Sequence, residues 1–184
     1  VLGTHARNTP IETFLDGGRG DGPRNDLAAL RGCRMVTASE PKRRKALDAT
    51  VLKAVSGDDV VTARFLFKEF FSYVPQFTVW LAANHRPRVD SDEGIWRRMH
   101  PVPFVVQFGK PGMPPRDRTL RGDLEAELPG ILRWVVDGCR AWQGQGLGTA
   151  RAVEEAAATY RMVVDPIAGF INACCTRESS GRTP

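Results

Sequence analysis

Short apolar runs, separated by polar and glycine-containing segments, mark the strands expected in the first half of the chain. Residues 33–38 and 77–83 have strand length, and the nearly continuous apolar run of 77–83 is typical of a strand covered on both faces. Residues 60–67 and 70–74 are rich in β-branched and aromatic side chains and are separated only by Lys68 and Glu69. This pattern predicts a β-hairpin with a basic tip.

Helical spacing of apolar residues predicts the other elements. A helix is expected over residues 41–57, with the basic run 42–45 in its first turn. Cations there oppose the helix dipole by about 0.3–1 kcal/mol each, so the run is expected to face nucleic acid, an acidic neighbour or solvent. Short helices are predicted over 25–32, capped by Asn25, and over 92–99. Further helices are predicted over 117–128, 130–142, 150–164 and 166–175.

The pattern changes from mixed to purely helical near residue 115. An α/β fold is therefore predicted for residues 1–115, followed by a helical C-terminal subdomain over residues 116–184. Residues 102–108 form one more predicted strand before this boundary. Residues 1–26 are rich in Gly, Asp and Arg and are predicted to be an exposed loop.

Composition narrows the class of protein. The 184 residues suffice for one hydrophobic core, and a net charge of +5 with a pI near 9.3 favours binding to polyanions. The four cysteines lack the spacing of a zinc site or a disulfide framework. No apolar run approaches the roughly 20 residues of a membrane span, and the first residues lack a signal-peptide pattern, so a cytoplasmic location without membrane contact is expected.

Polar residues follow two of the predicted strands. Glu40 comes after the first strand and Asn84 after the apolar strand, and adjacent Arg97 and Arg98 lie further along. The C-terminal ends of strands in open α/β sheets are where ligands bind. Each residue alone has an ordinary explanation as a loop residue or a helix cap, but their order indicates one shared site.

This order resembles the superfamily 3 helicases, which have an AAA+ type fold related to P-loop NTPases. Within them it is most similar to the phage and plasmid primase-helicase family, a relative of the poxvirus primase-helicase. The stretches that carry the resemblance are residues 30–40, 52–59, 62–64, 75–77, 83–87, 94–98, 124–134 and 158–161.

The resemblance implies an ATP-dependent DNA helicase with ATP and Mg²⁺ as cofactors. Glu40 matches the end of the Walker B strand, where a carboxylate serves the metal, the attacking water or both; Ser39 precedes it where many relatives carry a second acid. Asn84 matches the sensor position, with a helix cap as the alternative. Arg98 is the first choice for an arginine finger that reaches a neighbour's nucleotide, and Arg97 is the second.

The resemblance also implies partners. The family's hairpin grips single-stranded DNA, and here Lys68 is the candidate at the tip, with Arg64, Lys53 and the basic run 42–45 in support. A homo-oligomeric ring, a hexamer by analogy, and a primase domain or primase partner are implied, in phage or plasmid DNA replication within a bacterial cell. Core packing is predicted, in preference to base stacking, for four hairpin side chains: Phe65, Phe67, Phe70 and Phe71.

The family's phosphate-binding loop, G-x-x-x-x-G-K-[ST], is absent from the 184 residues. The sequence also opens without Met. We therefore expect a segment of a longer protein, inactive as an ATPase alone and active in its full-length parent. Two alternatives remain: a non-catalytic basic module that binds DNA or mediates assembly after losing its nucleotide site, and an AAA+ initiator that melts origins without processive unwinding.

Overall fold

The computed structural model describes residues 2–17, 22–39, 45–89, 92–165, 167, 170, 171, 174 and 175. The chain divides into two compact units. The first unit contains Leu2–Met99 together with the chain from Ala158 onward, and the second unit contains His100–Ala157. Each unit is described by itself.

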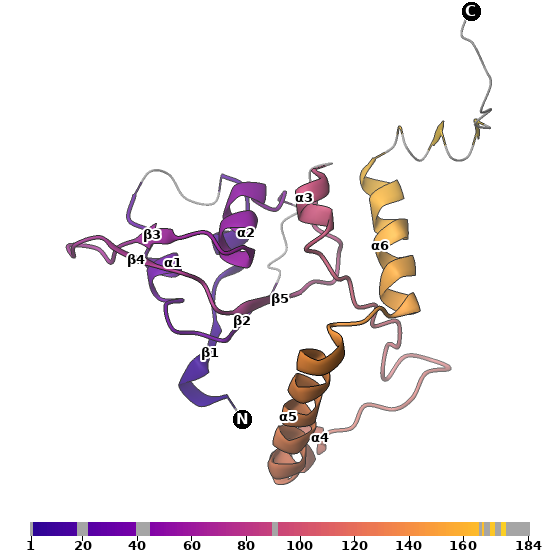
Figure 1. Ribbon diagram of the computed structural model, residues 1–184. Coiled ribbons are helices and arrows are strands. Elements are labelled where there is room, and N and C mark those ends of the chain that lie inside the picture. Colours follow the sequence, from indigo (N-terminus) through magenta and orange to yellow (C-terminus); the bar gives the residue numbers. More distant parts are fainter. Residues whose placement is uncertain are drawn as a thin grey trace, which may run out of the picture. The chain divides into compact units, whose positions relative to one another are not determined.

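A three-stranded parallel sheet organises the first unit (Figure 1). Its strands are β1 (Ala6–Asn8), β2 (Met35–Ser39) and β5 (Thr78–Ala82), in the order β1-β2-β5. The register pairs Met35 with Ala6 on one side and with Thr78 on the other. The strands predicted over 33–38 and 77–83 are therefore confirmed and are neighbours in the sheet, with β5 at one edge of the described order, and the fold is mixed α/β with a parallel sheet.

The core of this unit is built on the buried residues of β2. Val36 and Ala38 are buried and alternate with more exposed residues along the strand, as the twofold period of a strand requires. Phe14, Leu30 and Ile95 from the surrounding segments are fully buried in the same cluster. The helical elements of the unit, apart from the end of α6, are η1 (Gly3–His5), η2 (Ile11–Phe14), α1 (Asn25–Ala28), α2 (Ala49–Ser56) and α3 (Glu93–Trp96).

The prediction that residues 1–26 form an exposed loop is wrong for most of this stretch. It contains strand β1 and the 3-10 helix η2, and Ile11, Phe14 and Leu15 are buried. Their spacing of three and four residues places them on one side of the turn, and the Asp48 N–H donates to Phe14 O at 2.9 Å. Residues 18–21 lie outside the described part of the chain.

Strand β5 is less covered than its apolar sequence predicts. Thr78, Trp80 and Ala82 are exposed, and Val79 and Leu81 are half-buried, so only one face packs on the core described here. The prediction of a strand covered on both faces is therefore wrong for the described structure. An apolar run shows that its side chains favour the protein interior. Whether both faces of the strand are buried depends on which other segments pack against them.

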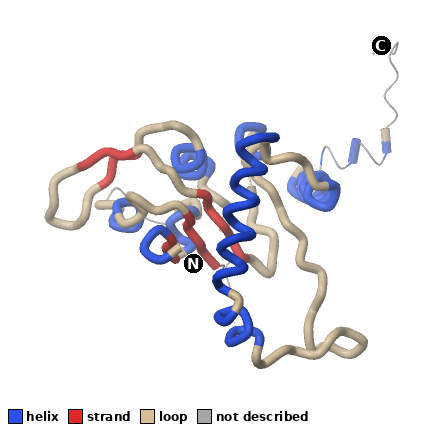
Figure 2. The backbone as a smooth tube through the Cα atoms, turned by 60° about the horizontal axis from the view of Figure 1, so that its bottom comes forward, coloured by secondary structure: helices blue, strands red, loops and turns tan. Residues whose placement is uncertain are grey.

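The predicted hairpin is confirmed, with a longer loop than expected. Strands β3 (Val61–Ala63) and β4 (Phe71–Tyr73) pair antiparallel and form a separate two-stranded sheet (Figure 2). Ala63 pairs with Phe71, so residues 64–70 form the loop in place of a two-residue tip.

The second unit contains the predicted helices but not the predicted strand. Its helices are α4 (Leu120–Ala126), α5 (Leu128–Gln145) and the first part of α6 (Arg151–Val164). Residues 102–108 form no strand in this fully described stretch, because β-propensity becomes a strand only where another strand offers backbone partners. The predicted helix over 166–175 lies largely outside the described residues. None of the described helices combines the length and apolarity that crossing a membrane requires.

Candidate functional site

Backbone pairing brings β2 and β5 together at their carboxyl ends and again at residues 46 and 88. Ser39 at the end of β2 pairs with Ala82 at the end of β5. Further along, Ala46 forms a parallel bridge with Arg88, and the Leu47 N–H donates to Arg88 O at 2.8 Å. The two connecting segments thus start and end next to each other at the carboxyl edge of the sheet, which is the edge where parallel sheets bind ligands.

These connecting segments carry two of the predicted site residues. Asn84 is exposed and lies two positions beyond Ala82. Glu40 directly follows Ser39 in the sequence and lies outside the described residues, as do Lys42, Arg43 and Arg44. The pairing of Ser39 with Ala82 therefore brings the strand that precedes Glu40 and the strand that precedes Asn84 to the same point of the sheet.

The helix predicted over residues 41–57 begins later than expected, and of the basic run 42–45 only Lys45 is described. Helix α2 begins at Ala49, and Asp48 caps it by accepting the Val51 N–H at 3.0 Å. Lys45 precedes this cap and is half-buried. An aspartate at the N-cap satisfies an orphan N–H group and complements the dipole, so the helix starts where this acceptor stands.

Lys53 is already engaged within the first unit. Its Nζ lies 2.5 Å from Asp92 Oδ2, while Asp92 Oδ1 accepts the Gly94 N–H at 2.7 Å and caps α3. The hydrogen bond from Lys53 is the main cause that lowers the pKa of Asp92. A Cβ on Gly94 would lie 2.8 Å from Asp92 Oδ1, so a larger residue there would have to displace the capping carboxylate. Lys53, proposed from the sequence for DNA, therefore joins α2 to α3.

The two arginines that follow α3 differ in their contacts. Both Arg97 and Arg98 are exposed. Arg98 Nη1 donates to Gly94 O at 2.7 Å, so its guanidinium group folds back on its own helix. The Arg97 side chain makes no hydrogen bond or ion pair to any residue that the structure describes, although its backbone N–H donates to Glu93 O at 3.2 Å.

Tyr160 links the last helix to this site and was not among the predicted site residues. It is buried, its hydroxyl donates to Pro87 O, and its ring packs edge-on against Trp96 with 5.2 Å between centroids. Arg86 lies 5.4 Å above the same ring. Tyr160 therefore contacts both the segment that contains Asn84 and the helix that precedes the arginine pair. A lone tyrosine in an alanine-rich helix was the available signal in the sequence.

The hairpin loop carries two of the residues predicted to contact DNA, of which Lys68 is exposed and Arg64 is half-buried. Lys68 is exposed at the turn, and Arg64 lies with its guanidinium carbon 4.5 Å from the centroid of the Phe70 ring. Phe67 is 92% exposed and Phe70 is 63% exposed, so the prediction that these rings pack in a core is wrong. Phe71 is half-buried and does pack against the core.

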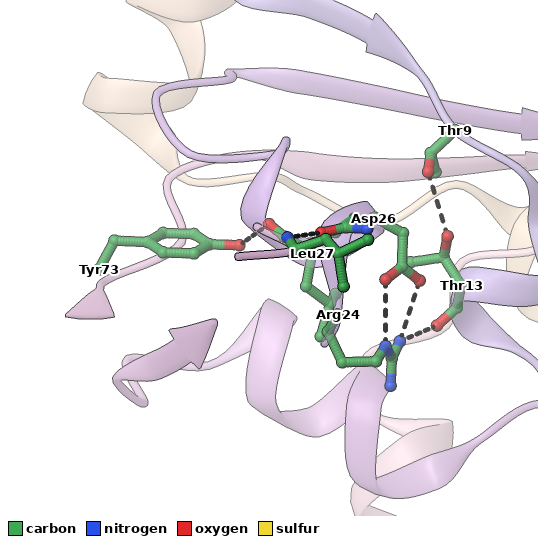
Figure 3. A network of polar contacts seen from close by, with 8 residues as sticks. Thr9, Thr13, Arg24, Asp26, Leu27 and Tyr73 are labelled. Carbon is green, nitrogen blue, oxygen red and sulfur yellow. Dashed lines mark hydrogen bonds and ion pairs between the residues drawn. The ribbon is translucent and has the colours of Figure 1, made fainter. Parts of the chain in front are cut away.

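Helix α1 anchors this hairpin. The Tyr73 hydroxyl donates to Leu27 O at 2.7 Å, and burial of that hydroxyl raises the pKa of Tyr73 to about 12 (Figure 3). Asn25 was predicted to cap α1, and this prediction is wrong. Asn25 is the first helical residue, and its Oδ1 accepts the Leu66 N–H at 2.7 Å. A side-chain oxygen can satisfy either its own helix or another segment, and here the loop provides the donor.

An ion pair between the half-buried Arg24 and the buried Asp26 holds α1 in place. Arg24 donates from Nε to Asp26 Oδ1 at 3.1 Å and from Nη2 to Thr13 O at 3.0 Å, as Figure 3 shows. Burial raises the pKa of Asp26, but the hydrogen bond and charge of Arg24 outweigh burial and leave this pKa below its ordinary value of 3.8. Asp26 therefore stays ionised at neutral pH and fixes the end of α1 that faces the hairpin.

Some of these residues have side chains that suit the binding of ATP and Mg²⁺. Asn84 offers an amide at the sheet edge, and Arg97 and Arg98 offer cations that suit phosphate oxygens. The loop of amides and Lys that cradles the phosphates has no counterpart in the sequence. Asn84, Arg97 and Arg98 therefore have the chemistry to contact phosphate oxygens, and the 184 residues contain no G-x-x-x-x-G-K-[ST] loop beside them.

Comparisons with known proteins point to one class. No protein-family model matches the chain. It is 29% identical over 161 residues, 79% of its length, to "Putative helicase L207/L206" of Acanthamoeba polyphaga mimivirus. It is 33% identical over 118 residues, 61% of its length, to "Putative helicase 022R" of Frog virus 3 (isolate Goorha). The chain spans only 17% and 12% of these two relatives. Their similarity supports a helicase-like family for the chain.

Proposed function

We propose that this chain is part of an ATP-dependent DNA helicase of the superfamily 3 type, similar to phage and plasmid primase-helicases. The observation that carries the proposal is the parallel pairing of β2 with β5, because the strands that precede Glu40 and Asn84 in the sequence end at the same, ligand-binding edge of the sheet. The similarity to two viral proteins named as helicases supports the same function.

The proposed roles follow the chemistry of phosphoryl transfer. Bound Mg²⁺ would neutralise charge on the phosphates, and Glu40 would serve the metal or hold the attacking water. Asn84 would orient the water or the γ-phosphate. Arg98, with Arg97 as second choice, would extend toward the nucleotide of a neighbouring subunit in a ring, for which a hexamer is the expected size. Lys68 and Arg64 would contact the phosphates of a single DNA strand.

Phosphate release tests the catalytic proposal. The chain alone should be inactive, and a version extended upstream to include a phosphate-binding loop should hydrolyse ATP. In that longer protein, Glu40→Gln and Arg98→Ala should each abolish turnover, and mixing the two variants should restore part of it at shared subunit boundaries. Robust hydrolysis by the chain alone, or a strict lack of restoration, would contradict the proposed division of labour.

A second candidate function is a non-catalytic DNA-binding or assembly module that has lost its nucleotide site, for which the net charge of +5 supports contact with DNA. The two functions differ in one measurement. If no phosphate-loop signature is encoded upstream and the longer protein lacks ATPase activity while the chain still binds single-stranded DNA, the module is the correct description.

A further inference from the structure

The turn of the β3–β4 hairpin holds a bulky side chain in an unfavourable backbone conformation. The Lys68 N–H donates to Phe65 O at 3.0 Å and closes a four-residue turn in which Phe67 is third. Phe67 has a φ of 58° and is the only non-glycine residue with positive φ in the described part of the chain. Glycine or asparagine is favoured at such a position, so folding alone does not explain phenylalanine here.

The strain does not serve to bury the ring. Phe67 is 92% exposed, so its placement gains no hydrophobic burial within the first unit. Phe104 is equally exposed at 93%, but it lies in an irregular segment with no strained residue. Strain that is held at an exposed aromatic side chain is typical of a binding site, because such conformations concentrate where a ligand is contacted.

The surroundings of Phe67 suit an anionic strand that carries flat rings. Phe70 is also largely exposed, and the guanidinium group of Arg64 stacks on its ring at 4.5 Å. Lys68 is adjacent in sequence, and Glu69 is the one acidic residue between Val61 and Val74. Aromatic faces beside cations are the two components that single-stranded nucleic acid requires, one for its bases and one for its phosphates.

The support beneath the turn is rigid. The bond from the Leu66 N–H to Asn25 Oδ1 ties the turn to α1, and Tyr73 ties the opposite end of the hairpin to Leu27. Phe71 is clamped between Phe65 and Tyr73, with 6.1 Å between centroids on each side. A site whose backbone is fixed before binding loses less conformational entropy when the ligand arrives.

We infer that Phe67 and Phe70 form a stacking site for the bases of single-stranded DNA, with Lys68 contacting the backbone phosphates. This inference rests on the proposed DNA-binding function and adds to it a contact with the bases. A purely electrostatic site would contact the phosphates alone, whereas the site inferred here also contacts the bases. Stacking of this kind accepts every base, because every base has an aromatic face.

An abasic strand separates the two kinds of contact. The 184-residue chain is titrated, with anisotropy as the readout, against a labelled oligothymidylate and against an abasic oligomer of equal length and charge. Base stacking predicts that the abasic strand binds at least about tenfold more weakly. Phe67→Leu, which keeps an apolar side chain of similar size, should weaken binding to oligothymidylate about tenfold and leave the abasic strand unaffected. Phe67→Trp, which keeps an aromatic face, should bind oligothymidylate as tightly as the wild type.

Salt dependence provides the matched control. Lys68→Ala should reduce the slope of log K against log salt by about 0.7 for both strands, whereas Phe67→Leu should leave the slope unchanged. Thermal unfolding followed by circular dichroism should be the same for both variants as for the wild type, because both side chains are exposed.

Three results would overturn the inference. Equal binding of both strands, with Phe67→Leu unchanged, would remove the stacking site and leave the proposed electrostatic grip intact. Failure of the wild-type chain to bind either strand would instead remove the DNA-binding function itself, and the stacking site with it. A change in sedimentation of Phe67→Leu in the absence of DNA would assign the tip to contacts between copies of the chain.

Discussion

In the first unit the side chains of Phe14, Leu30 and Ile95 are fully buried, whereas no residue between His100 and Ala157 is buried. The first unit is joined by contacts between distant parts of the sequence, such as Arg24 with Thr13 and Tyr160 with Pro87. Each salt bridge of the second unit joins two residues of the same helix that are one helical turn apart.

The helices of the second unit leave many apolar side chains uncovered. Leu132, Trp134 and Trp142 of α5 are exposed, and the pairs Arg121–Glu125 and Arg133–Asp137 are of the local i, i+4 kind. Such pairs contribute about 0.3–0.5 kcal/mol each. Helices in proteins owe most of their stability to packing, so the first unit is expected to hold most of the folding free energy of the chain.

Truncation of a core residue should expose this difference most strongly. Phe14→Ala should lower the free energy of unfolding of the first unit by about 3–5 kcal/mol, because it removes a large buried ring and leaves a cavity. Urea unfolding, with hydrogen exchange of β2 peptides as the local readout, measures this loss. The matched change Leu132→Ala should cost less than about 1 kcal/mol. Equal losses at the two positions would mean that the second unit has a core of its own.

Removal of one member of an ion pair tests whether charged contacts also contribute more stability in the first unit than in the second. Asp26→Ala should destabilise the first unit by about 2–4 kcal/mol, because it leaves Arg24 without its buried partner. The control Arg133→Ala breaks an exposed pair of the second unit and should cost about 0.3–0.5 kcal/mol. The two losses are compared by urea unfolding at neutral pH. A loss as small for Asp26→Ala as for the control would show that the buried pair contributes nothing net.

Acid should weaken the first unit through the same carboxylate. Because the pKa of Asp26 lies below 3.8 in the folded protein, its contribution to stability is fully present above that pH and is lost as pH falls through the folded pKa. Asp26→Asn removes the titrating group, so the difference in unfolding free energy from wild type should shrink as pH is lowered below 3.8. Urea unfolding at a series of pH values tests this, and a constant difference would contradict it.

The contact of Tyr160 with Pro87, which lies within the first unit, should give the smallest effect. Tyr160→Phe keeps the ring against Trp96 and removes the hydroxyl that donates to Pro87 O, so a loss of about 1 kcal/mol is expected. Hydrogen exchange should increase mainly in peptides that contain Pro87 and Arg88. An unchanged exchange pattern there would show that the ring alone positions the helix.

The sequence predicted much of the fold because several elements follow local rules. Strand β2, strand β5 and the hairpin were expected from apolar and β-branched runs, and the helices of the second unit were expected from their periodicity. Side chains that act within their own neighbourhood also follow from sequence, as Asp48 and Asp92 do when they cap the helices that begin beside them.

Contacts between distant segments explain what sequence reasoning missed. Asn25 has the chemistry of a helix cap but bonds to the hairpin loop, and Lys53 has the chemistry of a phosphate contact but pairs with Asp92. Phe67 has the chemistry of a core residue but lies exposed in a strained turn. The sequence determined what each side chain can do, whereas the tertiary structure decided which partner it meets, because a partner far along the chain is chosen by packing and pairing rather than by local pattern.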